Sequence, residues 1–135
     1  MITYKENNIL NMPITYICCK ANSKGKSETE LTKNIENNWP QTYYYYRSEC
    51  LYNPSSDLEG GIIINRIMDN SYVIYMIEKD NQITNSLNEI VKNIKKDNSI
   101  LRFSKGDLGN TEKELLINQR IICDKLEDYN VEFYT

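Results

Sequence analysis

The sequence contains no histidine, and this absence excludes mechanisms that need an imidazole base, including Ser-His and Cys-His arrangements. Any catalysis must use carboxylates, amines, amides or water. Four cysteines are present, but no two form a CxxC pair, and without histidine a mixed zinc site cannot be completed. Cys18 and Cys19 lie in an apolar run, where reduced thiols behave as small core residues. We therefore expect no metal, no other cofactor and a reducing, cytosolic compartment.

A basic cluster, a long apolar run and a signal peptide are also missing. The formal net charge is -3, with both signs interspersed, so nothing attracts duplex nucleic acid. No apolar run approaches the ~20 residues that a membrane helix requires, and "MITYKENNIL" lacks the basic start and apolar core of a signal peptide. The length of 135 residues fits one domain, residues 1–135. We expect a soluble, cytoplasmic, single-domain protein.

The first part of the chain contains two strand patterns and one helix pattern. Alternating apolar and polar residues predict a strand at residues 2–6, and a more buried strand follows at 14–19. A capping-box pattern at residues 27–30 then begins a helix whose apolar residues recur every four positions. We predict that this helix ends at Pro40.

The middle of the chain is less regular. Residues 41–60 have no clear period and contain turn residues, so we predict an irregular connection, with a strand at the four tyrosines 43–46 as the alternative. Two apolar runs follow at 61–67 and 71–78. The short segment "MDN" between them predicts a hairpin.

The last part alternates helix and strand patterns. Thr84 is placed to cap an amphipathic helix, and residues 99–104 read as a strand. A second capping box at Thr111 begins a long helix that we extend to Tyr129. Residues 131–135 form the predicted final strand.

This order of elements indicates the fold class. Helices that connect strands in both halves of the chain imply an α/β domain, with a mainly parallel sheet covered on both faces. Ligands in such sheets bind outside the carboxyl ends of the strands, where loops lead into helices. Two loops occupy such positions: "KANSKGKSE", residues 20–28, and "SKGDLGNTE", residues 104–112.

Both loops contain a small residue, a lysine and a glycine before a capped helix. Each can therefore offer backbone N–H groups and a helix N-terminus to an anion, and together they can hold a diphosphate. Asp107 would repel an anion unless it turns away. The alternative is that each glycine only makes a turn before a helix. Three lysines add positive charge beside the loops: Lys24, Lys26 and Lys105.

The tyrosines allow two interpretations. Residues 43–46 can stack a base or ribose, but an exposed face or an oligomer contact explains them as well. Trp39 is better explained as a core residue.

Element order and loops together resemble the macrodomain, the ADP-ribose-binding fold. "YKENNILNMPITYICCKANSKG" is similar to the macrodomain opening, and "WPQTYYYYRSEC" resembles a stretch after the first helix in the branch that includes terminal ADP-ribose glycohydrolase. "SYVIYMIEKDNQITNSLNEIVKNIKK" and "VEFYT" are also similar to that branch. The resemblance implies a three-layer α/β/α fold with a mixed, mainly parallel, six-stranded sheet.

The resemblance also implies residue roles. Asn8 replaces the family's aspartate that accepts from the adenine amino group, Asn22 lies where an asparagine faces the distal ribose, and Tyr134 lies where a late aromatic packs on adenine. The implied ligand-binding residues are Asn8, Ile9, Asn22, Ser23, Lys24, Gly25, Ser27, Ser104, Lys105, Gly106, Leu108, Gly109 and Tyr134.

The glycohydrolase branch uses a lysine nucleophile and an assisting aspartate. The lysine position falls near Arg66 or Ile67, and a protonated arginine is no nucleophile. The aspartate position falls near Asn110, with Asp107 displaced by three residues. Asp107 and Asn110 are therefore the catalytic candidates.

Three functions remain as hypotheses. The first is binding of ADP-ribose or an ADP-ribose-derived nucleotide, without turnover, in a cleft between residues 22–28 and 105–111. The second is an ADP-ribosyl hydrolase acting on protein or nucleic acid. The third is a degenerate macrodomain that binds another protein through its tyrosine-rich segment.

Overall fold

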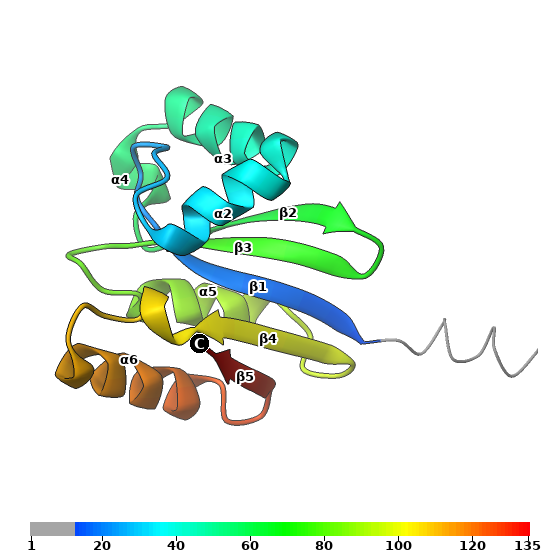
Figure 1. The fold of residues 1–135 in the computed structure, drawn as a ribbon, viewed down its shortest axis with the longest axis vertical. Helices are drawn as coiled ribbons and strands as arrows, with labels where there is room; N and C mark the ends of the chain where they lie inside the picture. The colour runs from blue at the N-terminus through cyan, green and yellow to red at the C-terminus, as the bar shows by residue number, and fades with distance from the viewer. Residues whose placement is uncertain (1–12) are drawn as a thin grey trace, which may run out of the picture.

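The computed structural model describes residues 13–135, which form a five-stranded sheet in the order β2-β3-β1-β4-β5 (Figure 1). The strands are β1 (Ile14–Ala21), β2 (Ile62–Met68), β3 (Ser71–Ile77), β4 (Ser99–Ser104) and β5 (Asn130–Tyr134). Strand β1 runs parallel to β3 and β4, β5 runs parallel to β4, and β2 is antiparallel to β3. The sheet is therefore mixed and mainly parallel, as expected. Five strands are seen where six were expected, and the strand predicted at residues 2–6 lies outside the described residues.

Helices cover both faces of the sheet (Figure 1). Helices α2 (Glu30–Asn38) and α3 (Pro40–Tyr52) lie over one face, and α5 (Thr84–Asn93) and α6 (Glu112–Lys125) lie over the other. Because successive strand side chains point to opposite faces, Cys18 packs with the α5 and α6 side and Cys19 with the α2 and α3 side. Both thiols are buried and reduced, as predicted.

The tyrosine segment is a helix, so both the irregular connection and the alternative strand were wrong. Pro40 occupies the first turn of α3, where its missing N–H costs nothing. Tyr43 and Tyr46 are buried three residues apart, and Tyr44 and Tyr45 are exposed. The Tyr46 ring stacks on Tyr75 of β3 at a centroid distance of 4.3 Å. Two apolar rings on one side of the helix anchor α3 to the sheet.

Several predicted helix ends move by a few residues. The capping box is formed by Thr29 and Thr32, since each side chain accepts from the other's backbone N–H; the expected box at residues 27–30 was wrong. Thr84 is the first residue of α5 and not its cap. Thr111 caps α6 as predicted. That helix ends at Lys125, before the predicted end.

The short helix α4 (Ser55–Leu58) and the 3-10 turn η1 (Lys105–Asp107) complete the described chain. None of the helices within residues 13–135 combines the length and apolar composition that a membrane span requires.

Candidate functional site

The carboxyl ends of β1, β3, β4 and β5 meet at one edge of the sheet, and two cavities open there. Residues 28–31 contribute to both, because Glu28 and Thr29 line one cavity and Glu30 and Leu31 line the other. The tyrosine cavity, of about 250 Å³, is lined by Glu30, Leu31, Asn34, Ser104, Gly106, Asp107, Tyr134 and Thr135. The lysine cavity, of about 240 Å³, is lined by Lys20, Ala21, Asn22, Lys24, Lys26, Glu28, Thr29, Glu78 and Asn81.

Asn22 shapes the loop that follows β1. Its Oδ1 atom accepts from the backbone N–H of Lys24 at 2.9 Å, and its Nδ2 atom donates to the carbonyl of Lys26 at 3.0 Å. The Tyr46 hydroxyl donates to the Asn22 carbonyl. These bonds turn the chain so that Lys24 and Lys26 are exposed along the lysine cavity. Asn22 thus positions the two cations in addition to lining the cavity.

Gly25 serves the loop's packing. It has a φ of +74°, and a Cβ placed on it would lie 3.1 Å from the Cβ of Cys50 and 3.3 Å from the Cα of Arg47. Its carbonyl accepts from the Tyr43 hydroxyl. Gly25 is buried against α3 and does not line either cavity.

The loop after β4 divides its residues between the cavity and the core. Gly106 lines the tyrosine cavity, and a Cβ there would meet no atom closer than 3.9 Å. Leu108 is fully buried in the core beneath α6. Asn110 is exposed, and its backbone N–H donates to the Glu114 carboxylate. Asn110 lines neither cavity.

Gly109 packs against the start of α6, and we expect Gly109→Ala to destabilise the protein by about 1 to 3 kcal/mol. The new Cβ would lie 2.6 Å from the Glu114 Cβ and 2.8 Å from the Leu115 backbone nitrogen. Gly106→Ala is the matched control and should change stability by less than about 1 kcal/mol. Urea unfolding of both variants measures the difference. Equal stability of the two variants would contradict the predicted packing.

Asp107 is the buried carboxylate of the site, with 6% of its surface exposed. Its Oδ2 atom accepts from the backbone N–H of Lys20 at 2.6 Å, joining η1 to β1. Burial raises the pKa of Asp107 to about 6, although the Lys20 N–H, the nearby Thr29 hydroxyl and the Lys20 charge act in the opposite direction. Lys20 in turn forms an ion pair with Glu78 at 3.5 Å. The carboxyl therefore changes charge close to neutral pH.

Tyr134 and Ser104 are direct partners in the β4–β5 ladder and line the tyrosine cavity together. The Arg102 guanidinium lies over the Tyr134 ring at 4.9 Å and forms an ion pair with Glu132 at 3.2 Å. A cation over a ring face restrains the ring. Burial raises the pKa of the Tyr134 phenol, which keeps it neutral and available as a donor.

The structure therefore brings part of the predicted site together. Ser104, Gly106, Asp107 and Tyr134 line one cavity, and Asn22 and Lys24 line the other. Seven predicted residues line neither cavity: Ser23, Gly25, Ser27, Lys105, Leu108, Gly109 and Asn110. Asn8 and Ile9 lie outside the described residues. Arg66 lies on β2, where it pairs with Asp69, away from both cavities.

Sequence reasoning missed the contributions of α2 and of the segment after β3. Glu30, Leu31 and Asn34 come from the first turns of α2, and Glu78 and Asn81 follow β3. Both contributions could have been predicted from the sequence. The helix that follows a site loop begins at the same edge of the sheet at which the adjacent parallel strand ends.

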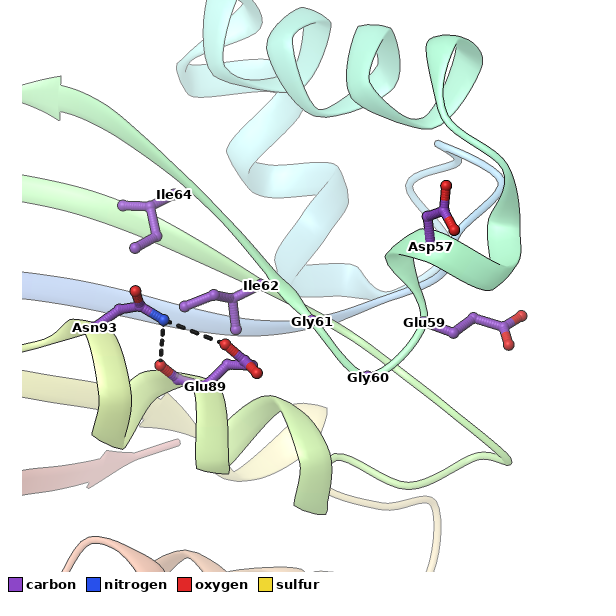
Figure 2. A pocket seen from close by; sticks show the side chains of 8 residues that line it. All are labelled: Asp57, Glu59, Gly60, Gly61, Ile62, Ile64, Glu89 and Asn93. Carbon is purple, nitrogen blue, oxygen red and sulfur yellow. Dashed lines mark hydrogen bonds between the residues drawn. The ribbon is translucent and has the colours of Figure 1, made fainter.

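A further cavity of about 570 Å³ lies beside β2 and α5 and shares no lining residue with the tyrosine and lysine cavities (Figure 2). In Figure 2 the Asp57 and Glu59 side chains point away from Glu89 and Asn93, and Asn93 donates to the Glu89 carbonyl and carboxylate. Within residues 13–135, no group of three acidic, cysteine or histidine residues is arranged to hold a metal ion. The acidic side chains of this cavity are therefore not arranged as a metal site.

Comparison with known proteins gives no match to a protein-family model and no match to a curated protein sequence. Solved structures, in contrast, match along almost the whole chain. The macrodomain of Thermus aquaticus DarG shares 15% identity over 95% of this chain and 93% of that chain, with a TM-score of 0.70. A macrodomain protein from Streptomyces coelicolor shares 16% identity over 91% and 88%, with a TM-score of 0.73.

A third structure, Thermosipho africanus DarTG in complex with ADP-ribose, shares 17% identity over 92% of this chain and 38% of that chain, with a TM-score of 0.69. At such identities the likeness concerns the backbone, and it agrees with the α/β fold and the mainly parallel sheet described above. The chain has the macrodomain fold.

Proposed function

We propose that the protein binds ADP-ribose or an ADP-ribose-derived nucleotide across the tyrosine and lysine cavities. The proposal rests mainly on one observation: both cavities open at the carboxyl ends of parallel strands, and residues 28–31 line both. That edge is where open α/β sheets bind their ligands. The Thermosipho africanus structure of the same fold contains ADP-ribose.

The side chains suit the parts of such a ligand. Lys20, Lys24 and Lys26 line the lysine cavity and offer charge-assisted hydrogen bonds to phosphate oxygens. Tyr134 gives the other cavity an aromatic side chain, against which a base or a sugar can pack. The lysines of one cavity suit the phosphates of an extended nucleotide, and Tyr134 of the other cavity suits its base or sugar.

Calorimetric titration with ADP-ribose, AMP, NAD and a cyclic ADP-ribose isomer tests the proposal. We expect ADP-ribose or an isomer to bind, and a ligand at 100 times its dissociation constant to stabilise the fold by about 2.7 kcal/mol. The double variant Lys24→Gln, Lys26→Gln should weaken binding by about tenfold. A matched control replaces two exposed lysines of α6, Lys113 and Lys125, with glutamine. Absence of binding by all four ligands, or equal loss in both double variants, would refute the proposal.

Hydrolysis of an ADP-ribosyl linkage is a second candidate, favoured by the raised pKa of Asp107, about 6. A carboxyl that titrates near neutral pH is suited to proton transfer. Incubating the protein with an ADP-ribosylated peptide or oligonucleotide, followed by chromatography, separates a hydrolase from a binder. Release of ADP-ribose by the wild-type protein, and its loss in Asp107→Ala, would assign turnover. An unchanged substrate would leave binding alone.

A further inference from the structure

One carboxylate oxygen at the strand ends is buried without a partner. Asp107 is 6% exposed, and its Oδ2 atom accepts from Lys20. Its Oδ1 atom is buried and has no hydrogen-bond partner among the described residues. Buried polar atoms are normally paired, and an ionised carboxylate can only accept. The partner that would complete this oxygen is therefore a hydrogen-bond donor.

None of the groups around Asp107 donates a hydrogen bond to its Oδ1 atom. The Lys20 ammonium pairs with Glu78. The Thr29 hydroxyl is near enough to lower the pKa of Asp107, but its hydrogen-bond partners in the structure are the hydroxyl and the backbone N–H of Thr32. Burial raises the pKa of the Cys18 and Cys19 thiols of β1 and of the Tyr134 phenol of β5. Glu30 of α2 lines the same cavity and adds negative charge. Because Oδ1 has no partner among the described residues, it is open to a donor placed in the tyrosine cavity.

An ADP-ribose-type ligand offers two kinds of group to this oxygen. Its ribose hydroxyls donate, whereas its phosphate oxygens only accept and carry negative charge. A phosphate beside an ionised, buried carboxylate is repelled strongly because the local dielectric is low. The lysine cavity supplies positive charge, because Lys20, Lys24 and Lys26 line it.

We propose, on the basis of the function proposed above, that the tyrosine cavity takes a ribose of the ligand and that one ribose hydroxyl donates to Asp107 Oδ1. Asp107 is then a specificity-determining residue. It selects a sugar in the tyrosine cavity and rejects a phosphate, so the phosphates are directed to the lysine cavity. A ribose also has a size and polarity that suit a cavity whose lining includes Tyr134, Ser104 and Asn34.

The two orientations of the ligand differ in the sign of their pH dependence. A hydroxyl that donates to Asp107 favours the ionised carboxylate, so binding lowers its pKa from about 6 and releases protons near that pH. Affinity then falls as the pH decreases from 7.5 to 5. A phosphate beside the same carboxyl would favour the protonated form, take up protons and bind more tightly at pH 5.

The test is calorimetric titration of ADP-ribose into the wild-type protein, Asp107→Asn and the control Asp124→Asn, whose side chain is exposed on α6. Titrations at pH 5, 6 and 7.5, in two buffers of different ionisation enthalpy, also count the protons released. We expect Asp107→Asn to bind about tenfold more weakly at pH 7.5 and to lose the pH dependence, because a charge-assisted bond becomes a neutral one. Circular dichroism verifies that the variant is folded.

The proton count on the wild-type protein is independent of any variant. Proton release at pH 6, together with weaker binding by Asp107→Asn, supports the assignment. Proton uptake, or equal or tighter binding by Asp107→Asn, overturns it and leaves the proposed ADP-ribose binding intact. If ADP-ribose binds neither the wild-type protein nor Asp124→Asn, both the proposed function and this inference fail.

Discussion

Replacing Asp107 with asparagine is expected to stabilise the ligand-free protein at pH 7 by an amount on the order of 2 kcal/mol. Burial raises the pKa of this carboxyl to about 6, compared with about 3.9 in an unfolded chain. Holding Asp107 ionised at pH 7 therefore costs free energy. An asparagine oxygen can still accept from the Lys20 N–H, which Asp107 Oδ2 now occupies, and the amide has no charge to bury.

The direction of this pH dependence follows from the number of protons that Asp107 binds in the folded and in the unfolded state. Between about pH 4 and 6 the folded state binds more protons at Asp107 than the unfolded state, so the free energy of unfolding contributed by this group falls as pH rises. The loss is complete above the folded pKa of about 6. Asp107→Asn removes this contribution, so wild type and variant should have similar stability at pH 4 and diverge as the pH approaches 7.

Urea unfolding of the wild-type protein, Asp107→Asn and Asp124→Asn at pH 4, 5, 6 and 7 measures this difference. The wild-type protein and Asp107→Asn share all their other ionisable groups, so the difference between their two curves isolates Asp107. Asp124 is exposed on α6 and its replacement should leave the wild-type pH dependence unchanged. An Asp107→Asn variant that is less stable than the wild type by the same amount at every pH would contradict the burial argument.

The sequence was sufficient to predict the fold class and the edge of the sheet that holds the candidate site. Strand β4 was predicted with its observed bounds, and the hairpin of β2 and β3 is confirmed, because apolar runs and turn residues determine these elements locally. Helix α3 was missed because tyrosine has both an apolar body and a polar tip. Four consecutive tyrosines therefore show no helical period in the sequence. In the structure, only Tyr43 and Tyr46 of these four are buried.

The residues that line the cavities were harder to predict. "KGDLGN" contains two glycines that look equivalent in the sequence, yet Gly106 faces a cavity and Gly109 contacts Glu114 and Leu115. The 3-10 turn determines which glycine faces the cavity, because it places Leu108 in the core and Asp107 beside β1. Contacts of this kind join residues far apart in the chain, and no local pattern encodes them.

The largest loss of stability is expected from Leu108→Ala, at about 2 to 5 kcal/mol. Leu108 is 0% exposed and belongs to the core cluster that contains Phe103, Leu101 and Ile122. Its removal leaves a cavity under α6. The resemblance to macrodomains gave Leu108 a ligand-binding role, whereas its burial predicts a structural one.

A matched leucine separates these two roles. Leu116→Ala removes the same atoms from a side chain of α6 that is 58% exposed, and should change stability by less than about 0.5 kcal/mol. Urea unfolding of both variants gives the comparison. Under conditions where Leu108→Ala remains folded, its affinity for ADP-ribose should fall much less than that of Asp107→Asn. Wild-type stability in Leu108→Ala, with a selective loss of binding, would instead mean that this leucine contacts the ligand directly.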